Sequence, residues 1–142
     1  MKNVRQLLQA KGGAVASIGP GMTVHEAMKI MAERNIGALL VLDGGQLVGV
    51  VSERDFARKL FLQDKLPSQL PVQDVMTRDV VYVRPEMTTE ECMALMTDKR
   101  VRHLPVIENG QVIGVVSIGD LVKETICEQE FIIQQLESYI HR

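Results

Sequence analysis

Two Ser-x-x-Asp phrases are the stretches of this sequence whose residue types and spacing could do chemistry. Ser52-Glu-Arg-Asp55 and Ser117-Ile-Gly-Asp120 each pass from a β-rich stretch into a helical pattern. In one interpretation, each serine caps a helix and each aspartate lies in its first turn, where the helix dipole favours a carboxylate. In the other, the serine and the free helix N–H groups hold a phosphate while the aspartate accepts both hydroxyls of a ribose. One geometry can serve both roles.

Basic residues near these phrases decide whether a phosphate could be held. Arg54 lies inside the first phrase, and Arg102 and His103 precede a β-rich stretch later in the chain. At the matching positions of the earlier stretch stand Gly37 and Ala38. Arg102 and His103 are either exposed at a strand entry or face a ligand, where arginine would hold a phosphate as a fork. We therefore expect two sites that are not equivalent.

The sequence lacks the residue patterns of the common catalytic, metal-binding and phosphate-loop sites. No Ser–His–Asp, Cys–His or paired-carboxylate arrangement can be assembled, and the three histidines have no paired spacing that would suit zinc. The phosphate-binding patterns GxGxxG and GxxxxGK[ST] are absent. Cys92 and Cys127 form no CxxC, and Cys92 is expected to be a buried apolar side chain. The sequence thus predicts neither an enzyme nor a metal site.

Composition narrows the class of protein further. The chain has 142 residues and a formal net charge of −2, so no nucleic-acid footprint is indicated. No apolar run reaches membrane-spanning length, and the first residues have no signal-peptide core. We expect a soluble cytoplasmic protein with no nucleic-acid or membrane partner.

The helices and strands that must position the two phrases occur twice, in an internal sequence repeat. When the chain is shifted by sixty-five positions, fifteen of the thirty-seven residues in 20–56 are identical in 85–121, without a gap. Each copy reads as strand, helix, strand, strand, helix: an extended piece (14–18 or 80–83), a helix opened by a Thr-x-x-Glu capping box (23–35 or 88–100), a hairpin (38–52 or 103–117) and a second helix (53–62 or 118–126). The fold class is therefore α/β, with tandem β-α-β-β-α repeats.

The predicted boundaries place the first repeat at 8–64, a linker at 65–75, the second repeat at 76–127 and an amphipathic C-terminal helix at 128–142. Residues 3–9 are expected to form a short helix that completes the first copy. The apolar stripe of the C-terminal helix packs either on its own domain or on a second subunit. Gly49 and Gly114, within the return strands, either let a base or backbone approach closely or mark a bulge or tight strand packing.

The tandem phrases "LLVLDGGQLVGVVSERD" and "RHLPVIENGQVIGVVSIGDLV", with "DVMT" at 74–77, resemble the cystathionine β-synthase (CBS) domain pair, or Bateman module. The similarity covers about residues 12–127 and is greatest to small stand-alone pairs, including the plant CBSX type. It implies two repeats about a pseudo-twofold axis, with clefts that bind AMP, ADP, ATP, S-adenosylmethionine or NAD(H). It also implies a homodimer, a regulatory role, and either nucleotide sensing or, alternatively, an adaptor role toward a thioredoxin-like protein with vestigial clefts.

The resemblance also assigns roles to residues. Asp55 and Asp120 would hold the ribose, and Ser52 and Ser117 the phosphate. The basic positions Arg102 and His103 match phosphate-facing residues of the family, whereas Gly37 and Ala38 do not. The residues that would flank the adenine or complete the ligand sites are Ile18, Ala38, Leu39, Arg54, Tyr82, Leu104 and Pro105.

Overall fold

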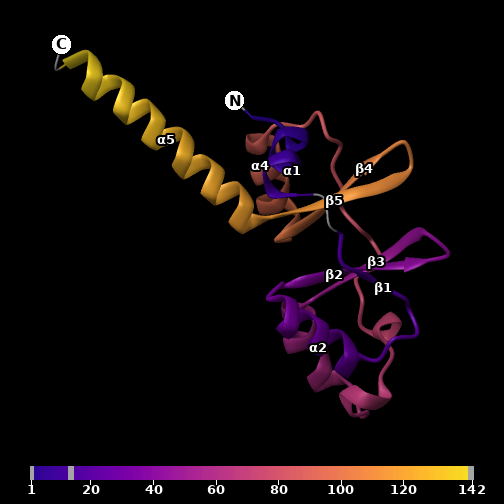
Figure 1. Cartoon of the computed structure of the whole chain (residues 1–142). Helices are drawn as coiled ribbons and strands as arrows, with labels where there is room; N and C mark the ends of the chain where they lie inside the picture. The colour runs from indigo at the N-terminus through magenta and orange to yellow at the C-terminus, as the bar shows by residue number, and fades with distance from the viewer. Residues whose placement is uncertain (1, 13–14, 141–142) are drawn as a thin grey trace. The chain divides into compact units, whose positions relative to one another are not determined.

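The computed structural model describes residues 2–12 and 15–140, and it divides the chain into two compact units. The first unit comprises residues 14–81, and the second comprises residues 1–13 together with 82–142. Each unit contains one copy of the repeat (Figure 1). Four residues of the predicted elements lie outside the described residues: Gly13, Ala14, His141 and Arg142.

The first unit is a small sheet with two α-helices. Its strands β1 (Ser17–Ile18), β2 (Ala38–Asp43) and β3 (Gln46–Ser52) lie in the order β1-β2-β3, with β1 parallel and β3 antiparallel to β2. The helices α2 (Val24–Arg34) and α3 (Glu53–Lys59) follow β1 and β3, and three 3-10 turns continue from α3: η1 (Leu60–Leu62), η2 (Pro67–Gln69) and η3 (Val72–Asp74). Buried residues of the strands, of both α-helices and of the stretch 70–76 around η3, which we call the η3 segment, form one apolar core.

The second unit repeats this pattern around the hairpin of β4 (His103–Glu108) and β5 (Gln111–Ser117). Helix α4 (Thr89–Lys99) precedes the hairpin and α5 (Ile118–Ile140) follows it. The extended piece predicted at 80–83 forms only an isolated parallel bridge, between Val83 and Val106. The predicted α/β repeats are confirmed.

Local signals explain why the elements begin and end where they do. Thr23 and Thr88 are the N-caps of α2 and α4, and each forms the predicted capping box with the glutamate three residues later. Asn35 ends α2 in the left-handed conformation. The hairpin turns use Gly44, Gly45, Asn109 and Gly110 at positive φ, which these residue types accept at low cost.

Helix α1 (Val4–Lys11) packs in the second unit, not with the first repeat as expected from the sequence. Its backbone N–H groups at Val4 and Arg5 donate to the carbonyls of Met87 and Pro85. In the first unit the η3 segment makes the same two bonds, from Val72 to Met22 and from Gln73 to Pro20. Each unit is therefore completed by a segment from outside its own repeat, and local periodicity could not show which repeat α1 would join.

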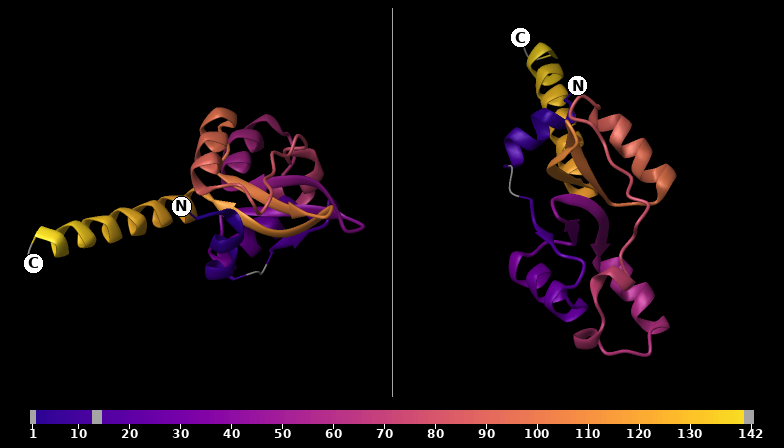
Figure 2. Two further views of the ribbon diagram at one scale, coloured as in Figure 1. Left: turned by 90° about the horizontal axis from the view of Figure 1, so that it is seen from above. Right: turned by 90° about the vertical axis from the view of Figure 1, so that its right-hand side faces the viewer.

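Helix α5 is continuous over 23 residues, where the sequence suggested a repeat helix followed by a separate C-terminal helix from 128. Its first turns pack beside α4, with Leu121 fully buried. Residues 129–140 are all exposed, and the helix runs outward from the rest of its unit (Figures 1 and 2). The sequence left open whether the apolar stripe of the C-terminal helix packs on its own domain or on a second subunit. In the structure, residues 129–140 do not pack on their own domain.

Candidate functional site

In the first unit, both carboxylate oxygens of Asp55 have partners at the corner where β3 passes into α3. Ser52 is the N-cap of α3: its Oγ accepts from the Asp55 N–H at 3.2 Å, and its own N–H donates to Asp55 Oδ2 at 2.9 Å. The second oxygen, Oδ1, accepts from Thr77 Oγ1 at 3.3 Å and lies 3.7 Å from Lys59 Nζ. The Asp55 side chain nevertheless keeps 20% of its surface exposed.

In the second unit, the equivalent corner has a different cation. Ser117 N–H donates to Asp120 Oδ2 at 2.8 Å, and Asp120 N–H donates to Ser117 Oγ at 3.1 Å. Lys11, from the end of α1, donates to the same Oδ2 at 2.7 Å and to the Val115 carbonyl at 2.9 Å. Although burial alone would raise the pKa of Asp120, the hydrogen bonds from Lys11 and Ser117 outweigh it and lower this pKa below its ordinary value.

The helix-capping interpretation of both phrases is therefore realised in the structure. The capping leaves part of each helix N-terminus unused: the amide groups of Arg54 and Gly119, second in their helices, take no part in the caps. The first amide of each helix donates to a strand-entry carbonyl, from Glu53 to Gly37 and from Ile118 to Arg102. The remaining capacity for a ligand at each corner is one amide and the exposed part of the carboxylate. The Ser117 hydroxyl can still donate to a ligand, whereas the Ser52 hydroxyl already donates to Asp55 Oδ2 at 3.0 Å.

Strand pairing brings the predicted strand-entry residues to these corners. In the first unit Ala38 lies opposite Ser52, and in the second His103 lies opposite Ser117. A small apolar residue in one unit thus corresponds to a half-buried imidazole in the other. This is the asymmetry predicted from the two strand entries, now located beside the serine of each phrase.

The other predicted residues fall into two groups by exposure. Arg54, Arg102 and Tyr82 are exposed and accessible to a ligand. Ile18, Leu39, Leu104 and Pro105 are buried, so their side chains offer little surface to an adenine. Ile18 and Leu39 belong to the core of the first unit.

Gly49 and Gly114 are closely approached by side chains of their own units. A Cβ on Gly49 would lie 2.5 Å from Met76 Sδ, and one on Gly114 would lie 2.6 Å from Leu8 Cδ2. Of the alternatives drawn from the sequence, tight packing is the one observed. Leu8 lies in α1 and Met76 follows η3 by two residues, so the glycines make room for the two segments that complete the units.

Three residues at the corners were not identified from the sequence. Lys59 is four residues after Asp55, a helical spacing that could have indicated the pair. Thr77 and Lys11 approach from distant parts of the chain, and no local pattern points to their carboxylate partners.

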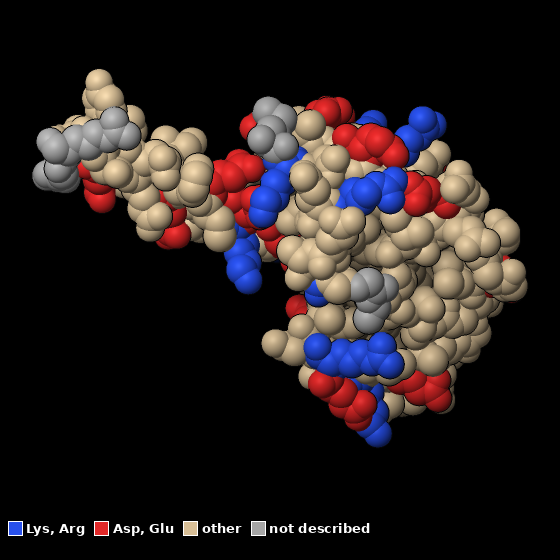
Figure 3. Space-filling model, turned by 45° about the horizontal axis from the view of Figure 1, so that its top comes forward, with Lys and Arg blue, Asp and Glu red and all other residues tan. Residues whose placement is uncertain are grey.

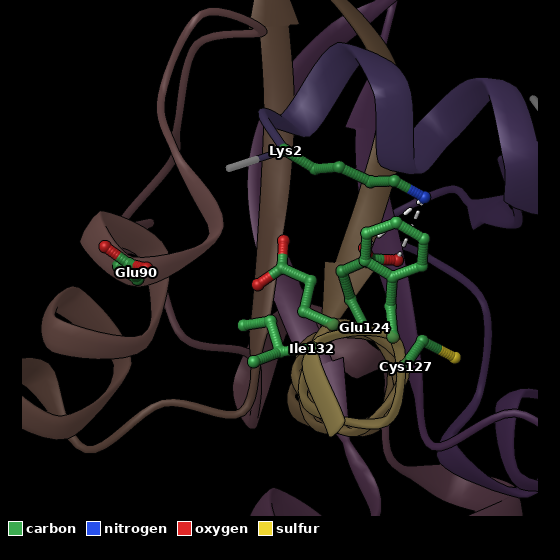
Figure 4. Close-up of a pocket in the computed structure, with 7 residues that line it drawn as sticks. Lys2, Glu90, Glu124, Cys127 and Ile132 are labelled. Carbon is green, nitrogen blue, oxygen red and sulfur yellow. Dashed lines mark hydrogen bonds and ion pairs between the residues drawn. The ribbon is translucent and has the colours of Figure 1, made fainter. Parts of the chain in front are cut away.

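A separate hollow lies along the helices of the second unit. It is lined by Lys2, Glu90, Glu124, Cys127, Glu128, Phe131 and Ile132, and Lys2 forms an ion pair with Glu124 across it (Figure 4). The predicted burial of Cys92 is confirmed, whereas Cys127 is exposed. Within residues 2–12 and 15–140, no cluster of His, Cys, Asp or Glu is placed to hold a metal ion, and no helix is long and apolar enough to span a membrane.

Comparison with known proteins agrees with this duplicated architecture. The CBS domain family model matches residues 13–62 and 72–126. The chain is 41% identical over 123 residues to the mitochondrial CBS domain-containing protein CBSX3 of Arabidopsis thaliana, covering 83% of this chain but only 60% of that relative's length. It is 35% identical to YhcV of Bacillus subtilis, with 75% of this chain and 76% of the relative covered.

Solved structures give the same result. The crystal structure of the CBS domain NE2398 is 55% identical, has a TM-score of 0.87, and covers 89% of this chain and 99% of its own. The CBS-domain protein ATU1752 of Agrobacterium tumefaciens is 38% identical, with a TM-score of 0.84, and the match covers 87% of this chain and 99% of that one.

The duplicated α/β units and the family match define a pair of CBS domains, a regulatory module of the kind that generally binds adenosyl ligands. The chain belongs to the CBS domain family.

Proposed function

We propose that this chain is a non-catalytic regulatory module that binds an adenine nucleotide, AMP, ADP, ATP or NAD, at its Ser-x-x-Asp corners. The observation that supports the proposal best is the repeated corner itself. In both units a partly exposed aspartate stands one helical turn from a serine hydroxyl, beside an amide that the cap does not use. The ribose hydroxyls would bind the carboxylate, and the phosphate would bind the serine and the amide.

The two corners should prefer different ligands. In the second unit Lys11, Arg102 and His103 supply basic groups at or next to the corner. The first unit has Arg54 and Lys59 near its corner, but Ala38 stands at the strand entry in place of His103. We therefore assign the more highly phosphorylated ligand to the Asp120 corner. The first corner, where Thr77 and Lys59 already engage Asp55, would take the adenosyl part with fewer phosphate contacts.

Thermal unfolding with and without ligand tests the proposal. A ligand that binds only the folded protein raises Tm, by about 2.7 kcal/mol of stabilisation at a hundredfold excess over Kd. AMP, ATP or NAD should raise Tm, and Asp120→Ala should abolish most of this rise. Because Asp120→Ala also removes a cap, Glu91→Ala serves as the matched control: it removes the capping box of α4 and should leave the ligand response intact.

The second candidate is an adaptor that regulates a thioredoxin-like partner and has no functional nucleotide site. The exposed apolar surface of α5 favours it, since such surface marks interaction sites. A Tm unchanged by the whole adenosine series, together with saturable binding of a thioredoxin-fold protein, would select the adaptor. Neither function requires turnover, so ATP and NAD should remain chemically unchanged.

Two further properties complete the proposal. We place the protein in the cytoplasm, which subcellular fractionation would test against the mitochondrial location in the name of the Arabidopsis relative. We also expect a homodimer. A hexameric assembly is described for a CBS-CP12 protein that is 26% identical, so the number of copies needs direct measurement.

A further inference from the structure

The Asp120 corner holds a side chain from a distant part of its own unit. Lys11 Nζ donates to Asp120 Oδ2 at 2.7 Å and to the backbone carbonyl of Val115 at 2.9 Å. Both of these oxygens are acceptors that a ribose hydroxyl can also use. Lys11 therefore occupies the same acceptors that the proposed ligand needs.

The lysine and the ribose compete most directly for Oδ2 of Asp120. A carboxylate oxygen offers about two lone pairs, and this oxygen accepts from Lys11 and also from the Ser117 N–H, at 2.8 Å. The bond from Ser117 belongs to the helix cap, whereas the bond from Lys11 comes from the end of a flexible side chain. A ribose that binds both oxygens of Asp120 must therefore displace the ammonium group of Lys11.

This displacement requires no movement of the backbone. Helix α1 is held in its unit by backbone hydrogen bonds from Val4 and Arg5, and the Lys11 side chain is 42% exposed. Its four-carbon stem can rotate while the helix stays in place, so the ammonium group remains near the corner. The phosphate that we assign to Ser117 and to the amide of Gly119 is then the nearest anion that can receive it.

The first corner is closed in a different way. The position equivalent to Val115 is Val50, whose N–H and carbonyl bond to the backbone of Thr77 at 3.0 and 2.9 Å. Lys59 comes from the same helix as Asp55 and lies 3.7 Å from Oδ1, beyond hydrogen-bond distance. A backbone bridge thus stands in the first unit where a movable side chain stands in the second.

We infer that Lys11 determines ligand specificity at the second corner by changing its partner, from Asp120 in the free protein to a ligand phosphate in the complex. The inference rests on the nucleotide binding proposed above. Adenosine must displace the ammonium group without offering it another anion, whereas a nucleotide supplies one. Lys11 therefore opposes the nucleoside and favours the nucleotide, and this difference in affinity is the specificity.

The overall charge of the surface gives no comparable selection. The chain has a formal net charge of −2. On the face shown in Figure 3, blue basic side chains lie beside red acidic ones. Selection for a phosphate must therefore come from individual groups at the corner, and Lys11 is the one whose present partner a ribose would replace.

An NMR titration of the native protein and of Lys11→Met, with adenosine and with ATP, tests the inference. The amide signal of Gly119 reports the second corner and that of Arg54 reports the first. At Gly119, Lys11→Met should tighten adenosine binding about 3- to 10-fold, because the ribose no longer competes with an ion pair. The same variant should weaken ATP binding at least ~3-fold, because a charged contact to the phosphate is lost. Dissociation constants measured at Arg54 should not change.

Lys2→Met is the matched control. It also removes a lysine of the N-terminal segment that pairs with α5, here through Glu124 at 3.3 Å, and should leave both constants at their native values. If Lys11→Met shifts the two affinities in the same direction, or shifts neither, the inference is wrong although nucleotide binding stands. If neither ligand binds the native protein, the proposed function fails and the inference fails with it.

A crystal structure with ATP gives an independent measurement. Lys11 Nζ should lie within hydrogen-bond distance of a phosphate oxygen and should have left Asp120 Oδ2. A bound nucleotide beside an intact Lys11–Asp120 pair would overturn the inference while supporting the proposed function.

Discussion

The ammonium group of Lys11, at the end of α1, lies 2.7 Å from Oδ2 of Asp120, near the start of α5. This contact joins two residues that are 109 positions apart in the chain. It places a cation from the N-terminal segment on the carboxylate that we assign to the ribose. The pair is partly exposed, with 42% of the lysine and 25% of the aspartate side chain accessible, so we expect it to contribute about 1 kcal/mol or less to stability.

Removing this cation should raise the pKa of Asp120. The folded-state pKa of Asp120 is below its ordinary value of 3.8, so the contribution of the pair is fully present above that pH and is lost as the pH falls through the lowered pKa. In Lys11→Met we expect a higher pKa for Asp120 and a loss of stability that is largest near neutral pH and shrinks in acid. Carboxyl carbon chemical shifts followed through a pH titration, together with urea unfolding at each pH, would measure both.

Lys2→Met is the matched control for this prediction. Lys2 forms an ion pair with Glu124, also on α5, and its removal should not change the titration of Asp120. Equal pKa values for Asp120 in the native protein and in Lys11→Met would contradict the assignment of the shift to Lys11.

Truncating Val4 should destabilise the second unit and not the first. Val4 is fully buried, and the backbone of α1 forms hydrogen bonds to the carbonyls of Pro85 and Met87. Val4→Ala should cost about 1–3 kcal/mol, the transfer and cavity cost of removing methyl groups from a packed site. Hydrogen exchange should accelerate in peptides from 82–126. Val72→Ala, at the equivalent position of the η3 segment, should instead accelerate exchange in peptides from 14–62. The same pattern from both variants would contradict the assignment of α1 to the second unit and of the η3 segment to the first.

A side chain at Gly49 should be poorly tolerated. The added Cβ would lie 2.5 Å from Met76 Sδ and 3.0 Å from the Thr77 carbonyl oxygen, and Met76 is buried. We expect Gly49→Ala to destabilise the protein by about 1–3 kcal/mol in urea unfolding, as overpacking does. Gly119→Ala is the control, since its nearest atom is Ser117 Oγ at 3.6 Å and alanine favours a helix. If Gly49→Ala were as stable as the native protein, the glycine would not be required by the approach of Met76.

Most of the fold could be predicted from the sequence because its signals are local. Capping boxes at Thr23 and Thr88, glycine-containing hairpin turns and the sixty-five-residue repeat each depend on residues close together in the chain or on its self-similarity. The same holds for part of the site. The Ser-x-x-Asp spacing predicts the caps at Ser52 and Ser117, and strand pairing then places Ala38 and His103 beside them.

What could not be predicted depends on contacts between distant segments. Helix α1 packs in the second unit and so brings Lys11 to Asp120. Because the two repeats are similar, nothing in the sequence of α1 indicates which of them it joins. The contact from Thr77 to Asp55 has the same origin. The continuity of α5 past residue 128 was missed for another reason: the end of the repeat coincides with no glycine or proline, so nothing there stops the helix.

The most direct test of the nucleotide-binding proposal is a crystal structure of the protein grown with AMP or ATP. We predict adenosyl density at the corners, with the ribose hydroxyls within hydrogen-bond distance of the Asp55 or Asp120 carboxylate. In the second unit, a phosphate should lie against Ser117. Density for the nucleotide away from both aspartates, or corners that remain closed by their caps at saturating ligand, would contradict the proposed function.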